Sequence, residues 1–533
     1  MPFREIRVAG TTIVETGVDS SLRAVTGTDP LERALAHADL GLPVPPETRL
    51  RLVKRVMARV ARLFTRHQVE VNRGLAEAVL GLRTALEEAE TRAKAIADDL
   101  ADEIAAVRTE LSELQVSILE GGNEVPRRDD APSGSAVGNE PVDEIPGVNC
   151  IGDFAGGTGL VEATRRLVQT LASSGVDVQV TDFDLPLPKS PIRTLPEVDG
   201  LPRGRSHDIE LWCVNVNEFR HVDDATLRPC GGPHRYVIGV WAWEAPSLPG
   251  WARREVARVD EIWVPSRFVR RAFRSATNKP ITVWRHVVDA SVTGGRRRSN
   301  FGLPEQAVLF FFNFDAGSSD GRKNPWGVIR AFERAFTDDE RRGPARLVLK
   351  TQNLTSHPSL RAALQASLDR VNGILIDQEL PRDGMNALLS SIDVYVSLHR
   401  GEGFGLGIAE AMVLGKPVIV TAYSGNMDYT SRTNSCLVGY TLRPVGQSDH
   451  RLTPHGEMVY EPGLIWAEPN IDQAARWMRY LYEHPEARDR IGAAGAQTVR
   501  NQFNAETVGN LVANRLVRIR REVLRGGATC VSS

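Results

Sequence analysis

The sequence predicts an α/β protein in which two doubly wound parallel sheets follow a long helical segment. From Gly147 onward, short apolar runs alternate with amphipathic stretches, a pattern typical of parallel strands joined by crossover helices. The alternation starts a second time near Gly294, which indicates a second sheet and a cleft between the two. Before Gly147, apolar residues recur at intervals of four and three residues, a spacing that predicts a helix.

Composition excludes several classes of protein. The chain has 533 residues, enough for three or four domains at roughly 150 residues each. Its 65 Lys and Arg residues against 67 Asp and Glu give a net charge of -2, so no excess positive field is available to bind nucleic acid. With 42% hydrophobic residues and no run of about eighteen apolar residues, neither general disorder nor a membrane-spanning helix is expected.

The cysteines and the start of the chain indicate a reducing compartment. The 5 cysteines lie far apart without a Cys-x-x-Cys pair, which argues against a zinc knuckle or a disulfide framework. The opening MPFREIRVAGTTIVE lacks the basic segment and continuous apolar core of a secretory signal. A cytoplasmic protein is therefore expected, and residues 1–46 otherwise carry little signal.

Residues 47–119 are expected to be helical, beginning with a basic amphipathic helix. Between Arg49 and Arg66 there are seven basic residues and no acid, while apolar residues recur at helical spacing. One interpretation is attachment to an anionic membrane surface or to an acidic face of a partner. The other is a helix that packs on its own protein with a solvated basic face.

From Leu75 to Ile118 the apolar residues form a heptad seam with one stutter after Leu100. A seam this narrow needs a partner helix, so we expect a coiled coil that makes the protein a homo-oligomer. A helix folded back on the globular body is the alternative. Residues 120–146 are rich in Gly, Pro, Ser and charge, which predicts a flexible linker.

The predicted strands divide into two groups of six. The first domain, residues 147–293, contains the runs VNCIGDF, DVQVTDF, IELWCVNV, YVIGVWAW, EIWVPS and PITVWRH. The second domain, residues 294–504, contains AVLFFFNF, ARLVLKT, GILIDQE, DVYVSLH, PVIVTAY and CLVGY. Residues 505–533 are expected to form a C-terminal helix and tail.

The glycine-rich turn after the strand DVYVSLH predicts an anion site. The strand ends near Leu398, Gly403 and Gly405 allow a ligand to approach the backbone, and a helix begins near Leu406 and ends at Gly415. The first amides of a helix carry partial positive charge and bind anions. A diphosphate is the expected ligand.

Two carboxylates, Glu402 and Glu410, flank this turn with seven residues between them. They are expected on opposite sides of the anion, so an acid and base pair across one glycosidic bond, as in a hydrolase, is not favoured. A carboxylate accepts two hydroxyl hydrogen bonds, which suits vicinal diols. We therefore expect Glu410 to bind a ribose and Glu402 to bind a sugar beyond the phosphates.

The stretch GEGFGLGIAEAM resembles the signature of retaining glycosyltransferase family 4, whose members have the GT-B fold of two Rossmann-like domains facing a cleft. The flanking SLHR and YSGNMDY are similar to the bacterial polysaccharide-assembly branch. The resemblance covers about residues 148–517. It implies that Glu410 binds the nucleotide ribose and Glu402 the donor sugar. It also implies that sugar and phosphate contact the amides of Gly403, Phe404, Gly405 and Leu406.

The resemblance also implies a basic pair for the diphosphate. Lys323 precedes a helix and Lys350 ends a strand, and both are expected to neutralise the leaving diphosphate. Arg322 is either a further donor-binding residue or a surface charge. Asp315 departs from the family pattern, which has an Arg at this point of the loop.

On the acceptor side, IGDFAGGTGL resembles the family's glycine-rich loop, with Gly156, Gly157, Thr158 and Gly159 facing the cleft. The alternative is that these glycines only permit strand-to-helix packing. The loop lacks the Lys and hydroxyl of a Walker A motif and is not a clean G-x-G-x-x-G, which disfavours nucleotide hydrolysis and dinucleotide binding.

Many family members carry a His where this chain has Trp243 and Glu244. Glu244 is predicted to orient the acceptor or to stabilise positive charge on the sugar, with burial for packing as the alternative. His286 and Asp289 resemble a domain-junction motif. His399 is expected either to touch the donor sugar or to cap its strand.

No required metal is implied by the resemblance, and no His, Asp or Cys cluster has metal-ligand spacing. Asp182 and Asp184 form a D-x-D pair that we interpret as a turn at the end of an edge strand. No cofactor is expected beyond the nucleotide-sugar co-substrate.

The predicted function is that of a retaining hexosyltransferase. It would move a sugar from a nucleotide-diphosphate donor to a hydroxyl of a glycan, glycolipid or other acceptor in cell-surface polysaccharide or glycoconjugate synthesis. Lipid-linked acceptors would place it peripherally at the inner face of the membrane. The alternatives are a GT-B nucleotide-sugar epimerase and a catalytically silent oligomeric scaffold. The intact Glu402 and Glu410 argue against the scaffold.

Overall fold

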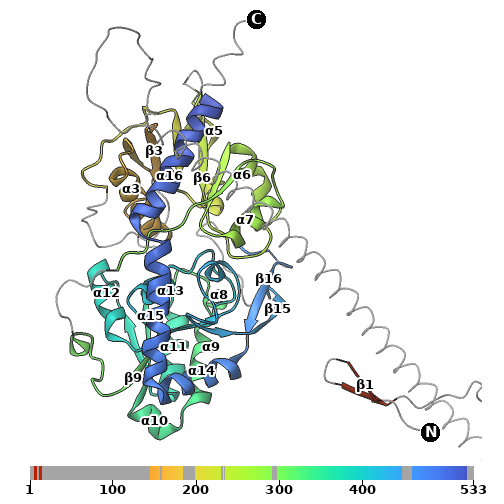
Figure 1. The fold of residues 1–533 in the computed structure, drawn as a ribbon, viewed down its shortest axis with the longest axis vertical. Helices are drawn as coiled ribbons and strands as arrows, with labels where there is room; N and C mark the ends of the chain where they lie inside the picture. Colours follow the sequence, from red (N-terminus) through yellow and green to blue (C-terminus); the bar gives the residue numbers. More distant parts are fainter. Residues whose placement is uncertain are drawn as a thin grey trace, which may run out of the picture. The chain divides into compact units, whose positions relative to one another are not determined.

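The computed structural model describes residues 5–8, 11–14, 145–156, 159–183, 198–229, 232, 234–290, 297–446, 459–461 and 463–524. The predicted basic helix and heptad seam, and all but the end of the predicted linker, lie outside these residues. The chain divides into two units, residues 1–136 and 137–533. In the first unit, β1 (Glu5–Val8) and β2 (Thr11–Val14) form an antiparallel pair in which Glu5 is opposite Val14. The second unit contains both predicted sheets (Figure 1).

The first sheet of this unit has six parallel strands in the order β4, β3, β5, β6, β7, β8. Their bounds are β3 (Val148–Gly152), β4 (Val178–Asp182), β5 (Ile209–Trp212), β6 (Tyr236–Val240), β7 (Glu261–Val264) and β8 (Ile281–Val283). Connecting helices are α3 (Gly159–Ser173), α4 (Val216–Phe219), α5 (Asp224–Leu227), α6 (Ala252–Arg258) and α7 (Arg267–Arg274). Chain order reverses beside β3, so the carboxyl ends of β3 and β5 mark a switch point where ligands commonly bind.

The second sheet also has six parallel strands, in the order β11, β10, β9, β12, β13, β14. They are β9 (Val308–Asp315), β10 (Ala345–Gln352), β11 (Ile374–Asp377), β12 (Val394–Ser397), β13 (Val418–Thr421) and β14 (Cys436–Val438). The helices are α8 (Asp320–Lys323), α9 (Pro325–Ala335), α10 (Asp338–Arg342), α11 (Pro358–Arg370), α12 (Arg382–Ser391), α13 (Leu406–Val413), α14 (Ile471–Glu483) and α15 (Pro485–Gln502). The prediction of two doubly wound sheets is confirmed.

Buried apolar side chains cover both faces of each sheet, which explains why the strands read as continuous apolar runs. On one face of the second sheet, Phe310 and Phe312 pack among the side chains of α9 and α14. On its other face, Phe311 packs with Ile408 and Met412 of α13. The helix α13, which carries Glu410, is therefore held on the sheet by its own hydrophobic contacts.

The antiparallel pair β15 (Tyr440–Pro444) and β16 (Ile465–Pro469) is an element that the sequence analysis missed. Twenty residues separate the two strands, and β15 is largely exposed, so it lacks the apolar pattern that indicates a strand. The pair follows β14 directly, and β16 leads into α14.

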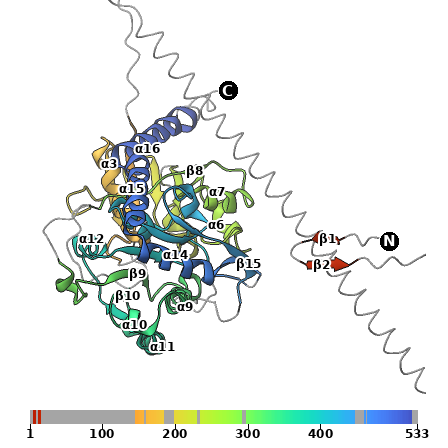
Figure 2. The same ribbon diagram turned by 60° about the horizontal axis from the view of Figure 1, so that its bottom comes forward.

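The C-terminal helix α16 (Ala505–Ile519) returns from the second domain to the first and packs on α3 (Figure 2). Its apolar side chains join those of α3 in one cluster: Val508, Val512, Leu516 and Ile519 with Leu167, Val168 and Leu171. Among the described residues, no helix meets the length and apolarity needed to cross a bilayer.

The end of α13 is set by a close backbone contact with α15. Gly415 ends the helix with a φ of +75°, which favours glycine. A Cβ on Gly492 of α15 would lie 2.0 Å from the Gly415 carbonyl oxygen, so only a glycine fits between the two helices.

We expect Gly492→Ala to destabilise the protein by about 1–3 kcal/mol because α15 must move away from the Gly415 backbone. In an unconstrained helix the same change would stabilise by roughly 0.5–1 kcal/mol. The unfolding midpoint in urea measures the effect. Gly250→Ala is the matched control, since nothing lies within 4 Å of its added Cβ. A Gly492→Ala variant as stable as the control would contradict this packing account.

Candidate active site

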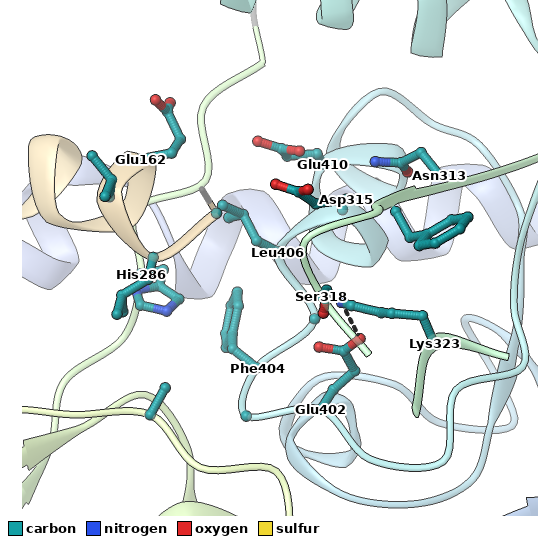
Figure 3. A pocket seen from close by; sticks show the side chains of 18 of the residues that line it. Glu162, His286, Asn313, Asp315, Ser318, Lys323, Glu402, Phe404, Leu406 and Glu410 are labelled. Atoms are coloured by element: carbon teal, nitrogen blue, oxygen red, sulfur yellow. Dashed lines mark hydrogen bonds and ion pairs between the residues drawn. The ribbon is translucent and has the colours of Figure 1, made fainter. Parts of the chain in front are cut away.

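A cavity of about 920 Å³ lies between the two sheets and is lined by residues of both domains. It opens at the carboxyl ends of the strands beside the two switch points. Figure 3 shows Glu162 and His286 on one wall, facing Glu410, Asp315, Lys323 and Glu402 on the other. The lining includes these candidate residues: Gly159, Glu244, Arg322, Lys323, Lys350, Glu402, Gly403, Phe404, Gly405, Leu406 and Glu410.

The glycine turn is packed tightly against its surroundings. Gly405 has a φ of +88° and precedes α13, so the chain turns there in a conformation that favours glycine. A Cβ on Gly401 would lie 2.1 Å from the Glu244 carbonyl oxygen, and one on Gly425 would lie 2.0 Å from the Gly403 oxygen. The turn is therefore held between the end of β6 in the first domain and residues 425–428 in the second.

Hydrogen bonds orient the carbonyl groups of this turn towards the protein. Ser266 Oγ donates to the Gly403 oxygen at 2.6 Å, and Tyr429 Oη donates to the Phe404 and Gly405 oxygens at 3.0 and 2.8 Å. The first amides of α13 have no partner within their helix, as at any helix N-terminus. These amides lie beside the cavity, so the N-terminus of α13 can bind an anion there, as the sequence predicts.

Glu402 is a buried carboxylate that two cations compensate. Lys323 Nζ lies 2.5 Å from its Oε1, and an Arg322 nitrogen lies 3.4 Å from its Oε2. Burial alone would raise the pKa of Glu402, but the charges of Lys323 and Arg322 lower it to about 2. Glu402 therefore stays ionised at physiological pH and can only accept hydrogen bonds.

Arg322 is buried, so its alternative interpretation as a surface charge is wrong. Ser319 caps the short helix α8 and turns this side chain inward, where Nη1 donates to the Gly401 oxygen at 2.8 Å. Nη2 donates to Ser318 Oγ at 3.0 Å and lies 3.7 Å from a carboxylate oxygen of Glu244. Arg322 thus holds the glycine turn and lies between two carboxylates.

Lys350 lies near the carboxyl end of β10, two residues before Gln352, and is buried beside the cavity. Its Nζ donates to Gln352 Oε1 at 3.2 Å, and burial lowers the pKa of this ammonium while the Asp315 charge opposes that change. Asp315 accepts hydrogen bonds from Gln352 and Asn353 at 3.1 and 2.9 Å. The residue that departs from the family pattern therefore belongs to a polar network around Lys350.

Glu410 is paired across the cavity with a residue that the sequence analysis missed. Arg166 Nη2 of α3 lies 2.5 Å from Glu410 Oε1, although 244 residues separate the two in sequence. Arg166 also contacts Glu162 one helical turn before it at 2.9 Å. The sequence shows only that Glu162 and Arg166 are one helical turn apart. This spacing predicts a contact within the helix and none with the second domain.

Glu244 and Trp243 have separate roles at the end of β6. Trp243 is fully buried and its Nε1 donates to the Ser247 oxygen at 2.8 Å. The indole therefore serves to pack the domain interior. Glu244 lines the cavity and accepts a hydrogen bond of 3.0 Å from Tyr460 Oη. Tyr460 comes from the connection between β15 and β16 and was also missed, because nothing in its local sequence indicates a position in the cavity.

The first-domain glycine loop is described in part. Gly156 and Gly159 lie among the described residues, and Gly159 begins α3 at the cavity, whereas Gly157 and Thr158 lie outside them. Arg165 Nη1 donates to the Phe154 and Gly156 oxygens at 2.9 and 3.2 Å. The loop is thus tied to the helix that follows it.

The two candidate histidines differ in position. His286 lines the cavity, packs edge-on against Phe404 at 4.8 Å, and has a pKa lowered to about 3 by burial, with the Arg166 charge acting in the same direction. His399 is buried, and its ring nitrogens lie 3.1 Å from Ser397 Oγ and 3.0 Å from Asn426 Oδ1. These contacts favour the strand-capping interpretation of His399.

Two predictions remain, that Asp289 belongs to a domain junction and that Asp182 and Asp184 form a turn and not a metal site. The Asp289 backbone oxygen accepts a hydrogen bond of 2.9 Å from Arg382 of the second domain. Asp182 ends the edge strand β4 and pairs with Arg203 at 2.7 Å, while Asp184 lies outside the described residues. Within the part of the chain that the structure describes, no group of His, Cys, Asp and Glu side chains could hold a metal ion.

Comparison with known families and structures agrees with this architecture. Residues 317–441 match the family model described as glycosyl transferases group 1, and this segment contains Arg322, Lys323, Lys350, Glu402 and Glu410. No curated protein matches the sequence significantly.

Solved structures share the fold at low identity. The crystal structure of Anabaena Alr3699/HepE in complex with UDP and glucose is 13% identical with a TM-score of 0.53, covering 70% of this chain and 100% of that chain. Sucrose-phosphate synthase from Thermosynechococcus elongatus is 14% identical with a TM-score of 0.50, covering 71% of this chain and 100% of that chain. A glycosyltransferase from Rickettsia africae is 13% identical with a TM-score of 0.50, covering 71% and 99%. The predicted GT-B fold is confirmed.

We expect Glu402→Gln to destabilise the protein near neutral pH, with a difference that shrinks in acid. The folded pKa of about 2 lies below the ordinary value of 4.5, so the stabilisation is fully present above pH 4.5 and is lost as the pH falls towards 2. Thermal unfolding midpoints across this pH range measure the difference. The exposed Glu333 supplies the matched control, Glu333→Gln, which should follow the wild type at every pH. A deficit of Glu402→Gln that does not change with pH would contradict the depressed pKa.

Proposed function

We propose that the chain is a retaining glycosyltransferase that transfers a sugar from a nucleoside-diphosphate sugar to a hydroxyl group of an acceptor. The observation that carries this proposal is the placement of Glu402 and Glu410 on either side of the N-terminus of α13, in a cavity shared by two doubly wound domains. The match of residues 317–441 to the group 1 glycosyl transferase model supports it.

The donor site is proposed to run along the glycine turn. The diphosphate would lie at the amides of Gly403 to Leu406, where the α13 N-terminus attracts negative charge. The ribose hydroxyls would donate to Glu410, and hydroxyls of the transferred sugar would donate to Glu402. The Anabaena protein crystallised with UDP and glucose, and with UDP-glucose, supports a donor of this chemical class.

Departure of the diphosphate is proposed to depend on the two lysines. The bond between the anomeric carbon and the diphosphate oxygen breaks, and the oxygen of the acceptor hydroxyl bonds to that carbon from the same face. The acceptor proton passes to the leaving phosphate. Lys323 and Lys350 stabilise the charge that gathers on the diphosphate, which is worth more in the transition state than in the ground state.

Glu244 is proposed to act on the acceptor side. It lines the cavity on the first-domain wall, 3.0 Å from Tyr460 Oη and 3.7 Å from Arg322, so its carboxylate is held in place. From there it would orient the acceptor hydroxyl or stabilise positive charge on the sugar. The first-domain glycine loop would border the acceptor.

The acceptor class is proposed from the sequence alone. A glycan or lipid-linked acceptor in polysaccharide or glycoconjugate synthesis is consistent with the basic segment from Arg49 to Arg66, which would bind an anionic membrane surface peripherally. The heptad seam would make the enzyme a homo-oligomer.

We expect Glu410→Gln to weaken binding of the preferred nucleoside diphosphate about tenfold, because charge-assisted hydrogen bonds to the ribose diol become neutral ones. Calorimetry with UDP, GDP, ADP and CDP first identifies the preferred base. Its 2′,3′-dideoxy analogue should bind the wild type and Glu410→Gln equally, since it lacks the diol.

Glu333→Ala, an exposed change in the same domain, serves as the protein control and should leave binding unchanged. Equal affinity of the wild type and Glu410→Gln for the ribonucleotide would refute the ribose assignment. A wild-type protein that binds none of the four nucleotides would refute the proposed function.

A further inference from the structure

Arg166 contacts three separate segments around the junction of the two domains. Its Nε donates to Glu162 Oε1 on its own helix at 2.9 Å, and Nη1 donates to the Val287 oxygen, after β8, at 3.3 Å. Nη2 donates to Glu410 Oε1 on α13 at 2.5 Å. Only 3% of the Arg166 side chain is exposed.

The base of this side chain is held firmly. Arg165 ties the start of α3 to the backbone at Phe154 and Gly156, and α16 packs against the same helix. The guanidinium is therefore presented to the cavity from a helix that is tied at its start and packed against α16.

The pair with Glu410 lies in the wall of the cavity, and both residues line it. A buried ion pair costs desolvation that its attraction only partly repays, so stability alone is a weak reason for placing it there. A carboxylate that receives a diol must be ionised and held in one orientation. Arg166 belongs to the opposite domain and donates a hydrogen bond to Oε1 of Glu410. This contact fixes the orientation of the Glu410 side chain.

We infer that Arg166 is a positioning residue of the nucleotide site, supplied by the opposite domain. It holds the carboxylate of Glu410 in the orientation that accepts the ribose hydroxyls. It also links donor affinity to closure of the cleft, because the two residues meet only when the domains are together. This inference rests on the proposed ribose role of Glu410.

A double-mutant cycle with Arg166→Met and Glu410→Gln tests the inference. The probe is whichever of UDP, GDP, ADP and CDP the full-length wild type binds most tightly, measured by calorimetry. Arg166→Met should weaken binding about tenfold in the wild-type background and less than about twofold in the Glu410→Gln background. Arg166→Lys, which retains the charge but not the three-way contact, should fall between the wild type and Arg166→Met.

A kinetic comparison separates positioning from general damage. Arg166→Met should raise the KM for the donor and change kcat less than about twofold, because the ribose is remote from the reacting carbon. Arg334→Met removes an arginine from an exposed ion pair with Asp472 and should leave both constants unchanged.

Three results would overturn the inference. A tenfold loss that persists in the Glu410→Gln background would mean that Arg166 acts on the ligand itself. Tighter nucleotide binding by Arg166→Met would mean that the pair competes with the ribose. If Glu410→Gln left nucleotide binding unchanged, Glu410 would not bind the ribose, and both this inference and the proposed ribose site would be wrong. The first two results would overturn this inference but leave the proposed function intact.

Discussion

The close backbone contact at the glycine turn is the constraint on which the rest of the site depends. A Cβ at Gly401 would meet the Glu244 carbonyl oxygen at 2.1 Å, so the end of β6 and the start of the turn are as near as two backbones can come. This contact brings the carboxylate of Glu244 beside Arg322 and Glu402, which belong to the other domain. Any side chain at Gly401 would separate the two halves of the cavity.

Charge compensation is the second organising feature. Each carboxylate that flanks the turn has a cationic partner in the protein itself, Lys323 and Arg322 for Glu402 and Arg166 for Glu410. The site is thus preorganised, because the cost of burying these charges is met by folding and not by substrate binding. Under the proposed function, a donor would share these partners, and its affinity would depend on the arrangement of both domains.

Much of the fold followed from the sequence because parallel strands buried on both faces leave continuous apolar runs. The turn around Gly403 and Gly405, and its two carboxylates, could be recognised for the same reason: the signal is local and ordered along the chain. The pair β15 and β16 could not, since β15 is exposed and twenty residues separate the strands.

The site residues that escaped prediction share one property, which is that their partners are distant in sequence. Arg166 contacts Glu410 244 residues away, and Tyr460 contacts Glu244 216 residues away. Arg322 and Lys323 are adjacent, yet the turn of α8 directs Arg322 into the protein and leaves Lys323 partly exposed. Adjacent positions in a loop do not reveal which of two charges faces a ligand.

A crystal structure of the full-length protein with its preferred nucleoside diphosphate tests the account most directly. The account predicts the ribose hydroxyls within hydrogen-bond distance of Glu410, with the diphosphate at the first amides of α13 between Lys323 and Lys350. A diphosphate bound instead at the first-domain glycine loop, with the ribose away from Glu410, would contradict it.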